Sequence, residues 1–184
     1  MSRMLIATLL LCAAAAAEDI TLVKDGKSDC VIVLAKFARS PVEERGAREL
    51  QAYIREMSGA ELQIVRSEGE LPAHCIGVQT EGPKPPDYRG PAFRPEESSV
   101  IFTPRGPLIC GGSPRGTLYG CYALLERLGV RWYTSRVARV PHAPTITLPQ
   151  TGVDEVGGPA FEYREPFFTE AVDKDRAARN PVNG

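Results

Sequence analysis

The sequence predicts an α/β domain: a mixed β-sheet with two main helices packed on one face. Two segments carry apolar residues at spacings of three and four, the spacing of a helix face, and short β-branched runs flank them. Residues 99–103 and 107–110 are two more apolar segments, joined by the turn sequence Pro104-Arg105-Gly106, which predicts a hairpin. A hairpin argues against an all-parallel sheet, so we expect a mixed sheet of about five to seven strands.

The first helix is predicted to begin after Ser40, which is a favourable N-cap. Pro41 suits the first helical position, and Glu43 completes a Ser-x-x-Glu capping box. Gly59 can take the left-handed conformation that ends a helix. The residues expected to form its buried face are Ala47, Leu50, Ile54 and Met57.

The second helix is predicted to begin in the same way, with Ser113 as the N-cap and Pro114 at the first position. Gly129 is expected to end it. Its apolar stripe is formed by Leu118, Cys121, Leu125 and Leu128.

Shorter segments predict the remaining elements. Strands are expected at residues 20–23, 30–34, 61–66, 75–78 and 130–133, with a turn at Asp25-Gly26 after the first of them. Residues 80–95 contain five prolines and are predicted to form a loop, because proline cannot donate to a sheet ladder. Residues 137–149 are predicted to be extended and to wrap the domain.

The first 17 residues are typical of a secretory signal peptide. Arg3 precedes a short apolar segment, and Ala15 and Ala17 suit cleavage before Glu18. The alternatives are a membrane anchor and a lipoprotein modified at Cys12, although a large residue precedes that cysteine. We therefore expect an exported protein, periplasmic or extracellular, without a membrane span after cleavage.

Composition excludes several classes of function. The chain is 43% hydrophobic and 24% charged with a net charge of −1, so we expect no nucleic-acid partner. Isolated His74 and His142 and the lack of a Cys-x-x-Cys spacing predict no metal site, and we expect no cofactor. The cysteines after the leader could form disulfides, but their apolar surroundings favour buried free thiols: Cys30, Cys75, Cys110 and Cys121.

No complete catalytic site is predicted. A glycosidase needs two carboxyl groups facing each other across a cleft. The acidic pairs are Glu43-Glu44, Glu96-Glu97 and Asp173 with Asp175. The first pair is expected to face water in the opening turn of a helix, and the second is expected to lie in a loop. The chain also lacks a Gly-x-Ser-x-Gly nucleophile turn.

Two further features have competing interpretations. Gly111-Gly112, before the second helix, could hold an anion at the helix N-terminus, but a tight turn with close helix–sheet packing is favoured. Trp132 could stack on a sugar ring, but a place in the core or at a domain interface is favoured, with the interface preferred.

Residues 116–133, GTLYGCYALLERLGVRWY, resemble a motif of the α/β domain that precedes the barrel in some glycoside hydrolases. Residues 47–54 with 58–60, and residues 159–165 (PAFEYRE), are similar to further motifs of that domain. The relatives are family 67 α-glucuronidases, family 20 β-N-acetylhexosaminidases and exported bacterial proteins that share the architecture. Since hexosaminidases have glycine where this chain has Glu165-Pro166, the last group is the closer match.

The resemblance implies a non-catalytic N-terminal domain whose carbohydrate substrate binds a barrel that follows it. The residue patterns predict a signal peptide at 1–17, an α/β domain at 18–150, a glycine-rich linker at 151–159 and a further strand and helix within 160–184. The resemblance implies that the α/β domain is an accessory domain and that 160–184 is the truncated first βα unit of a TIM-like barrel. Arg164 matches an arginine that contacts substrate hydroxyls at the end of the first barrel strand. The alternative is a free-standing carbohydrate-binding module with Trp132, Tyr133 and Tyr119 as a stacking platform.

Overall fold

The computed structural model describes residues 19–35, 40–67, 71–80, 93–134, 136–153, 157–161, 163, 164 and 179. The predictions for the leader, for residues 81–92 of the proline-rich loop and for most of residues 160–184 lie outside the described residues. Within the described part of the chain, no helix is long and apolar enough to cross a membrane.

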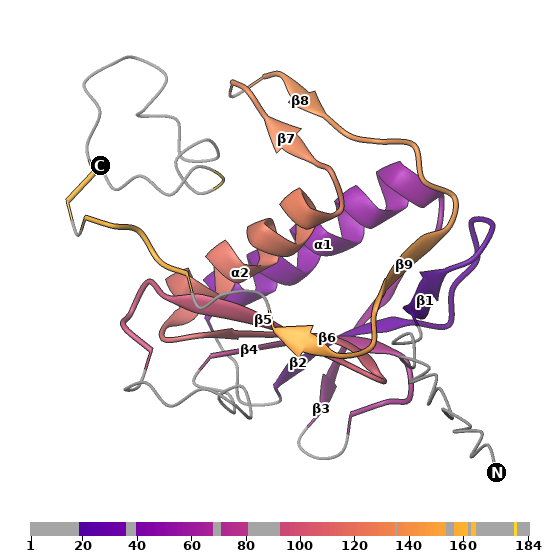
Figure 1. Ribbon diagram of the computed structural model, residues 1–184, viewed down its shortest axis with the longest axis horizontal. Helices are drawn as coiled ribbons and strands as arrows, with labels where there is room; N and C mark the ends of the chain where they lie inside the picture. The colour runs from indigo at the N-terminus through magenta and orange to yellow at the C-terminus, as the bar shows by residue number, and fades with distance from the viewer. Residues whose placement is uncertain are drawn as a thin grey trace, which may run out of the picture.

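A six-stranded mixed sheet forms the centre of the domain (Figure 1). Its order is β10 (Gly152–Val153), β5 (Ser98–Thr103), β6 (Gly106–Gly111), β4 (Cys75–Thr80), β2 (Val31–Ala35) and β3 (Gln63–Ser67). The last four of these strands are mutually parallel, whereas β5 runs antiparallel to both β6 and β10. The predicted hairpin is β5–β6, and the mixed sheet is confirmed.

Helices α1 (Pro41–Ser58) and α2 (Pro114–Arg127) lie side by side on one face of this sheet (Figure 1). Both begin at the predicted caps. The Ser40 side chain accepts a hydrogen bond from the backbone N–H of Val42, and that of Ser113 accepts one from Gly116, each at 3.3 Å. Gly59 has a φ of 83° and ends α1 as predicted.

Two small antiparallel pairs complete the domain. Strand β1 (Asp19–Val23) pairs with β9 (Ile146–Pro149), so the extended segment 137–149 returns to the first described strand. Strand β7 (Arg131–Trp132) pairs with β8 (Ala138–Arg139) in a hairpin that projects beyond the two helices (Figure 1).

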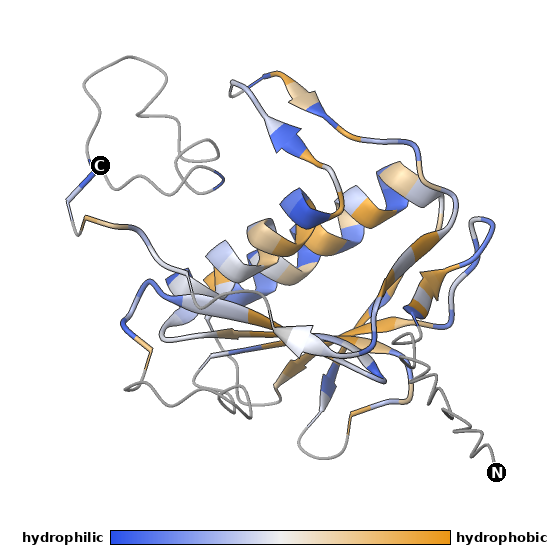
Figure 2. Cartoon of the chain, viewed as in Figure 1, coloured by the Kyte–Doolittle hydropathy of each residue, from blue (hydrophilic) through white to orange (hydrophobic). Residues whose placement is uncertain are grey.

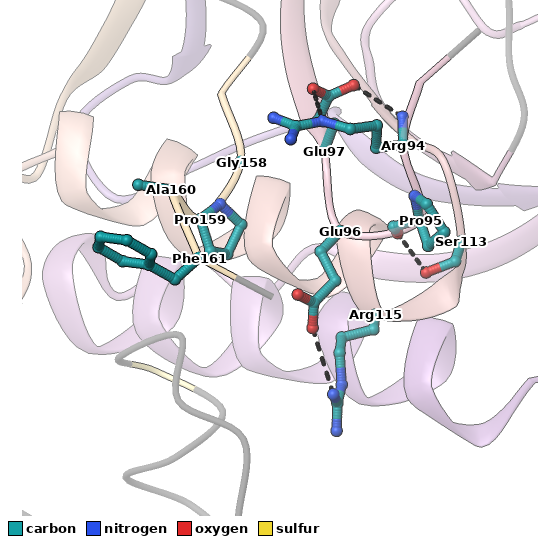
Figure 3. Close-up of a pocket in the computed structure, with 10 residues that line it drawn as sticks. All are labelled: Arg94, Pro95, Glu96, Glu97, Ser113, Arg115, Gly158, Pro159, Ala160 and Phe161. Atoms are coloured by element: carbon teal, nitrogen blue, oxygen red, sulfur yellow. Dashed lines mark hydrogen bonds and ion pairs between the residues drawn. The ribbon is translucent and has the colours of Figure 1, made fainter. Parts of the chain in front are cut away.

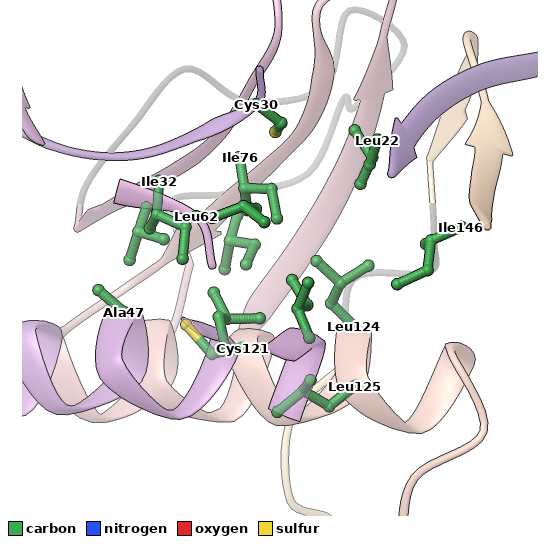
Figure 4. Close-up of a cluster of buried hydrophobic side chains, with 14 of the residues drawn as sticks. Leu22, Cys30, Ile32, Ala47, Leu62, Ile76, Cys121, Leu124, Leu125 and Ile146 are labelled. Atoms are coloured by element: carbon green, nitrogen blue, oxygen red, sulfur yellow. The ribbon is translucent and has the colours of Figure 1, made fainter. Parts of the chain in front are cut away.

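The core lies between the helices and the sheet, where the apolar faces of both meet (Figures 2 and 4). All four residues of the predicted α1 face are buried. In α2 the predicted stripe is buried except for Leu128, which is partly exposed because it is the C-cap. Other large side chains that are fully buried include Leu22, Ile32, Leu62, Ile76, Ile109 and Leu124.

Two predictions were made for Glu43: a capping-box role, and a position facing water in the first turn of α1. The structure differs from both. The residue surface of Glu43 is only 4% exposed, and its Oε1 accepts a hydrogen bond of 2.6 Å from the Thr80 hydroxyl at the end of β4. The Thr80 hydroxyl also lies 2.9 Å from that of Thr117 in α2. The capping-box role and the water-facing position are therefore wrong, because α1 and α2 bring their first turns together over the end of β4.

The four cysteines of the described chain are free and buried, which confirms the favoured interpretation: Cys30, Cys75, Cys110 and Cys121. Burial raises the pKa of each thiol, because the low-polarity surroundings disfavour the thiolate. For Cys30 the pKa rises to about 12. These thiols are core side chains and are not activated nucleophiles.

Candidate functional site

An open pocket of about 540 Å³ contains the second predicted acidic pair (Figure 3). Three segments that are distant in the sequence meet there: residues 94–97 before β5, the start of α2, and residues 158–161. The pocket therefore lies where the chain that follows β10 returns to the domain.

Glu96 is the centre of an ion-pair cluster at this pocket. Its Oε1 lies 3.2 Å from Nη1 of Arg115, and its Oε2 lies 2.9 Å from Nη2 of Arg164. The Glu96 and Arg164 side chains are 21% and 13% exposed, whereas Arg115 is 55% exposed. We call Glu96, Arg115 and Arg164 the Glu96 cluster. It ties the start of α2 and the returning chain to one carboxylate.

Glu97 is held by a different arginine. One carboxylate oxygen accepts a hydrogen bond of 2.7 Å from the backbone N–H of Arg94, and the other lies 2.6 Å from Nε of the same residue (Figure 3). The backbone hydrogen bond, followed by the guanidinium, lowers the pKa of Glu97. A general acid needs the opposite shift, so Glu97 is unsuited to protonate a leaving group.

The remaining polar group in the pocket also has a structural role. The Ser113 hydroxyl donates to the Pro95 carbonyl and accepts from the backbone of α2, which it caps. An added Cβ at Gly111 would lie 2.1 Å from the Thr117 nitrogen, and one at Gly112 would lie 2.1 Å from the Arg94 carbonyl oxygen. These close approaches support the packing interpretation of the glycine-rich turn.

Arg164, the predicted substrate contact, also lines a second open pocket of about 400 Å³. Tyr119 of α2, which is buried, lines the same pocket. Burial, and then the nearby Glu96 carboxylate, raise the pKa of Tyr119, although the Arg164 guanidinium opposes the shift. Nearby, Gly157 and Ser98 exchange both backbone hydrogen bonds, at 2.9 and 3.0 Å, which fixes the returning chain to the first residue of β5.

The three-ring stacking platform does not form. Trp132 and Tyr119 are 8% and 7% exposed, and of the three residues only Tyr133 is open to solvent. The Trp132 indole donates a hydrogen bond of 2.7 Å to the Tyr53 hydroxyl and packs edge-on against Tyr53 and Tyr122. Trp132 therefore belongs to the core and not to the preferred interface, because the β7–β8 hairpin folds its inner side onto the helices.

The other candidates are not brought together. His74 lies 2.9 Å from Asp29, and neither residue lines the two pockets described above. Asp173 and Asp175 lie outside the described residues. Among the described residues, no group of three or more histidine, cysteine, aspartate or glutamate side chains could hold a metal ion.

The charged side chains described in this pocket hold together segments that are distant in the sequence. Each of its glutamates is paired with an arginine, so neither is a free acid or base. The sequence drew attention to Glu96, Glu97 and Arg164, but not to Arg94 or Arg115. No local pattern marks those two arginines, since their role depends on segments that meet only in the folded domain.

No protein-family profile and no curated protein sequence matches this chain. Among solved structures it is similar to a family 115 4-O-methyl-α-glucuronidase with specificity for decorated arabinogalactans. The TM-score is 0.58 at 17% identity, over 79% of this chain and 19% of that one. The chain shares its fold with part of a glycoside hydrolase. A family 20 exo-β-N-acetylglucosaminidase from Vibrio harveyi aligns with a TM-score of 0.44 at 13% identity, over 81% of this chain and 18% of that one.

The chain thus spans about a fifth of the length of these structures. The sequence-based recognition of a glycoside hydrolase α/β domain is confirmed for the fold.

Proposed function

We propose that this chain is the non-catalytic N-terminal domain of an exported glycoside hydrolase that acts in carbohydrate breakdown. The observation that carries the proposal is the fold shared with part of a much longer glycoside hydrolase. The described pocket chemistry agrees with it, because the glutamates there are held by arginines and are not arranged as an acid and a base. In this proposal the catalytic carboxylates belong to a barrel that follows the domain.

The Glu96 cluster has a specific task in this proposal. It fixes the chain after β10 against the domain, so that residues 160–184 enter the barrel from a defined position. The exposed fractions of Phe161 and Tyr163 are 74% and 73%, which suits side chains that a following domain would cover. This surface is where we place the contact with the barrel.

Activity measurements test the non-catalytic role. The purified protein should give no turnover above a heat-denatured control with 4-methylumbelliferyl α-glucuronide, β-N-acetylglucosaminide, or a panel of other aryl glycosides. Turnover that co-purifies with the folded protein would overturn the proposal. The reading frame beyond codon 184 gives a second test: an in-frame barrel sequence supports the proposal, and an immediate stop codon would contradict the part of it that places a barrel after the domain.

Export is tested separately. Residues 1–17 fused to alkaline phosphatase should yield active enzyme outside the cytoplasm, and the processed product of the native chain should begin at Glu18. A fusion that stays in the cytoplasm would remove export from the proposal while leaving the glycosidase part intact.

Arg164 is proposed as a substrate contact of the complete enzyme. Its place beside the 400 Å³ pocket supports this role, and its ion pair with Glu96 offers a structural alternative. In the complete enzyme, Arg164→Lys should raise KM more than Glu96→Gln, because the second change leaves the guanidinium in place and removes only the ion pair that positions it. Equal effects of the two variants on stability, with KM unchanged in both, would assign Arg164 to the ion pair alone.

A further inference from the structure

The outer side of the β7–β8 hairpin carries an unusual pair of like charges. Arg131 and Arg139 stand directly opposite each other in the antiparallel ladder, and both are exposed. Directly opposed like charges destabilise a strand pair, by about 0.2–1 kcal/mol for typical cross-strand interactions. A hairpin of two-residue strands has little ladder energy to offset that repulsion.

The same side of the hairpin carries two exposed apolar residues. The backbone N–H of Tyr133 donates to the Val137 carbonyl at 2.9 Å, which extends the ladder by one further pair. Because side chains alternate along a strand, Tyr133 and Val137 share the face of Arg131 and Arg139. Tyr133 is 58% exposed and Val137 is 54% exposed. We call these four residues the hairpin face.

The opposite side of the hairpin anchors it. Trp132, which alternates with the hairpin face, is held between Tyr53 and Tyr122 at ring-centroid distances of 5.5 and 5.2 Å. The Nη1 atom of Arg131 donates to the Val130 carbonyl at 2.7 Å and to the Glu126 carbonyl of α2. The hairpin face is therefore presented on a fixed support, which lowers the entropic cost of binding.

Acidic partners are lacking within the part of the chain that the structure describes. No aspartate or glutamate there forms an ion pair with Arg131, Arg139 or the neighbouring Arg136, which is also exposed. By contrast, other exposed arginines of the domain have such partners, as Arg48 has Glu44 and Arg55 has Glu61. Among the described residues, no carboxylate therefore neutralises Arg136 or Arg139, and Arg131 is held by backbone carbonyls alone.

We propose that the hairpin face binds an acidic polysaccharide. The arginines contact its carboxylate or sulfate groups, and the Tyr133 ring packs on the apolar face of a sugar ring. Four side chains match one or two sugar units, whereas a stable protein interface needs about 800 Å² from each partner. This site is separate from the Glu96 cluster, and it does not depend on the proposed function of the domain.

The test is a binding measurement on the purified protein. Fluorescein-labelled oligogalacturonate supplies carboxylates, chondroitin sulfate oligosaccharides add sulfates, dextran is the neutral sugar, and poly-glutamate is an acidic chain without sugar. At low salt we expect the first two to bind and dextran not to bind. Stronger binding of oligogalacturonate identifies carboxylate as the preferred group, and stronger binding of chondroitin sulfate identifies sulfate.

Variants locate the site. Arg131→Gln with Arg139→Gln should weaken oligogalacturonate binding at least about tenfold, and Tyr133→Ser at least about threefold. Arg48→Gln, which removes an exposed arginine elsewhere, should change it less than about twofold. Since Arg131 also holds the end of α2, Arg139→Gln alone provides the variant that leaves the fold intact, with circular dichroism as the check.

Three results would overturn the proposal. The first is the lack of oligogalacturonate and chondroitin sulfate binding at millimolar concentration. The second is binding that Arg139→Gln and Arg48→Gln reduce equally, which indicates a general effect of net charge. The third is poly-glutamate binding of equal strength that Tyr133→Ser does not alter, which indicates an acidic protein surface as the partner.

Discussion

Nη2 of Arg164 lies 2.9 Å from Oε2 of Glu96, across 68 positions of the sequence. This ion pair joins the chain that follows β10 to the segment that enters β5. It is partly buried, and Arg115 contacts the same carboxylate from α2. The position of Arg164 is therefore set by a carboxylate that lies just before β5.

Replacement of Glu96 by glutamine should loosen this joint. The change removes both ion pairs, and we expect it to lower the free energy of unfolding by about 1–2 kcal/mol, since the pairs are only partly buried. Trypsin should also cut after Arg164 faster than in the wild type. Glu56→Gln, at an exposed position of α1, is the control and should change neither quantity. Equal proteolysis in both variants would contradict the role of the pair.

Truncation of Leu125 tests the helix–sheet core. Its side chain is fully buried, and Leu125→Ala should cost about 2–5 kcal/mol through lost burial and a residual cavity. Leu128→Ala is the comparison, because Leu128 is only partly buried against the same core and should cost clearly less. Urea denaturation measures both. A cost below about 0.5 kcal/mol for Leu125→Ala would show that the core does not depend on this face of α2.

Glu43 and its neighbour Glu44 should respond very differently to alanine. Glu43→Ala removes a buried carboxylate that accepts a hydrogen bond from the partly buried Thr80 hydroxyl, so we expect a loss of about 1–3 kcal/mol in the free energy of unfolding. Glu44→Ala breaks pairs with Arg48 and Arg66 at the surface and should cost less than about 1 kcal/mol. Equal losses, measured by urea denaturation, would contradict a structural role for the buried carboxylate.

The comparison of Glu43 with the helix caps shows which structural features could be predicted from the sequence. Ser40 and Gly59 were predicted correctly because a cap depends on residues within one turn of it. Glu43 was predicted wrongly because Thr80, its partner, lies 37 positions away. Only the folded arrangement of α1, β4 and α2 makes that carboxylate a buried acceptor.

The same limit applies to strand pairing and to the site. The sequence indicated residues 20–23 as a strand, but nothing local shows that β1 pairs with β9. In the Glu96 cluster, Glu96 and Arg164 were singled out from the sequence as part of an acidic pair and as a substrate contact. Neither reason predicted the ion pair that joins them. The periodic core could be predicted, whereas contacts between distant polar side chains could not.

The buried Cys30 thiol should make stability depend on alkaline pH. Its pKa is about 12 in the folded protein and near 9 in the unfolded chain, so the unfolded state loses its proton first. The resulting contribution to stability is complete below pH 9 and is lost as the pH rises towards 12. Over that window one proton corresponds to about 1.4 kcal/mol per pH unit.

Cys30→Ala should therefore show a shallower fall in the free energy of unfolding between pH 9 and 11 than the wild type. Val33→Ala is the control, since it truncates a buried side chain without removing a titrating group. It should lower stability by the same amount at every pH, as measured by urea denaturation at fixed ionic strength. Parallel curves for Cys30→Ala and the wild type would contradict the assignment.

Gly111 packs closely against backbone atoms, whereas Gly77 packs closely against a flexible side chain. Replacing each by alanine should therefore have different effects on stability. An added Cβ at Gly111 would lie 2.1 Å from the Thr117 nitrogen, so the backbone of α2 would have to move. At Gly77 the new atom would lie 2.5 Å from Cδ1 of Leu108, which can change its rotamer. We expect Gly111→Ala to cost more than about 3 kcal/mol or to prevent folding, and Gly77→Ala to cost about 1 kcal/mol. Thermal unfolding of the Gly111→Ala and Gly77→Ala variants measures the two losses of stability. Equal stabilities would mean that the backbone before α2 can move to accept the added Cβ. The glycines of this turn would then need another explanation, such as the anion site considered in the sequence analysis.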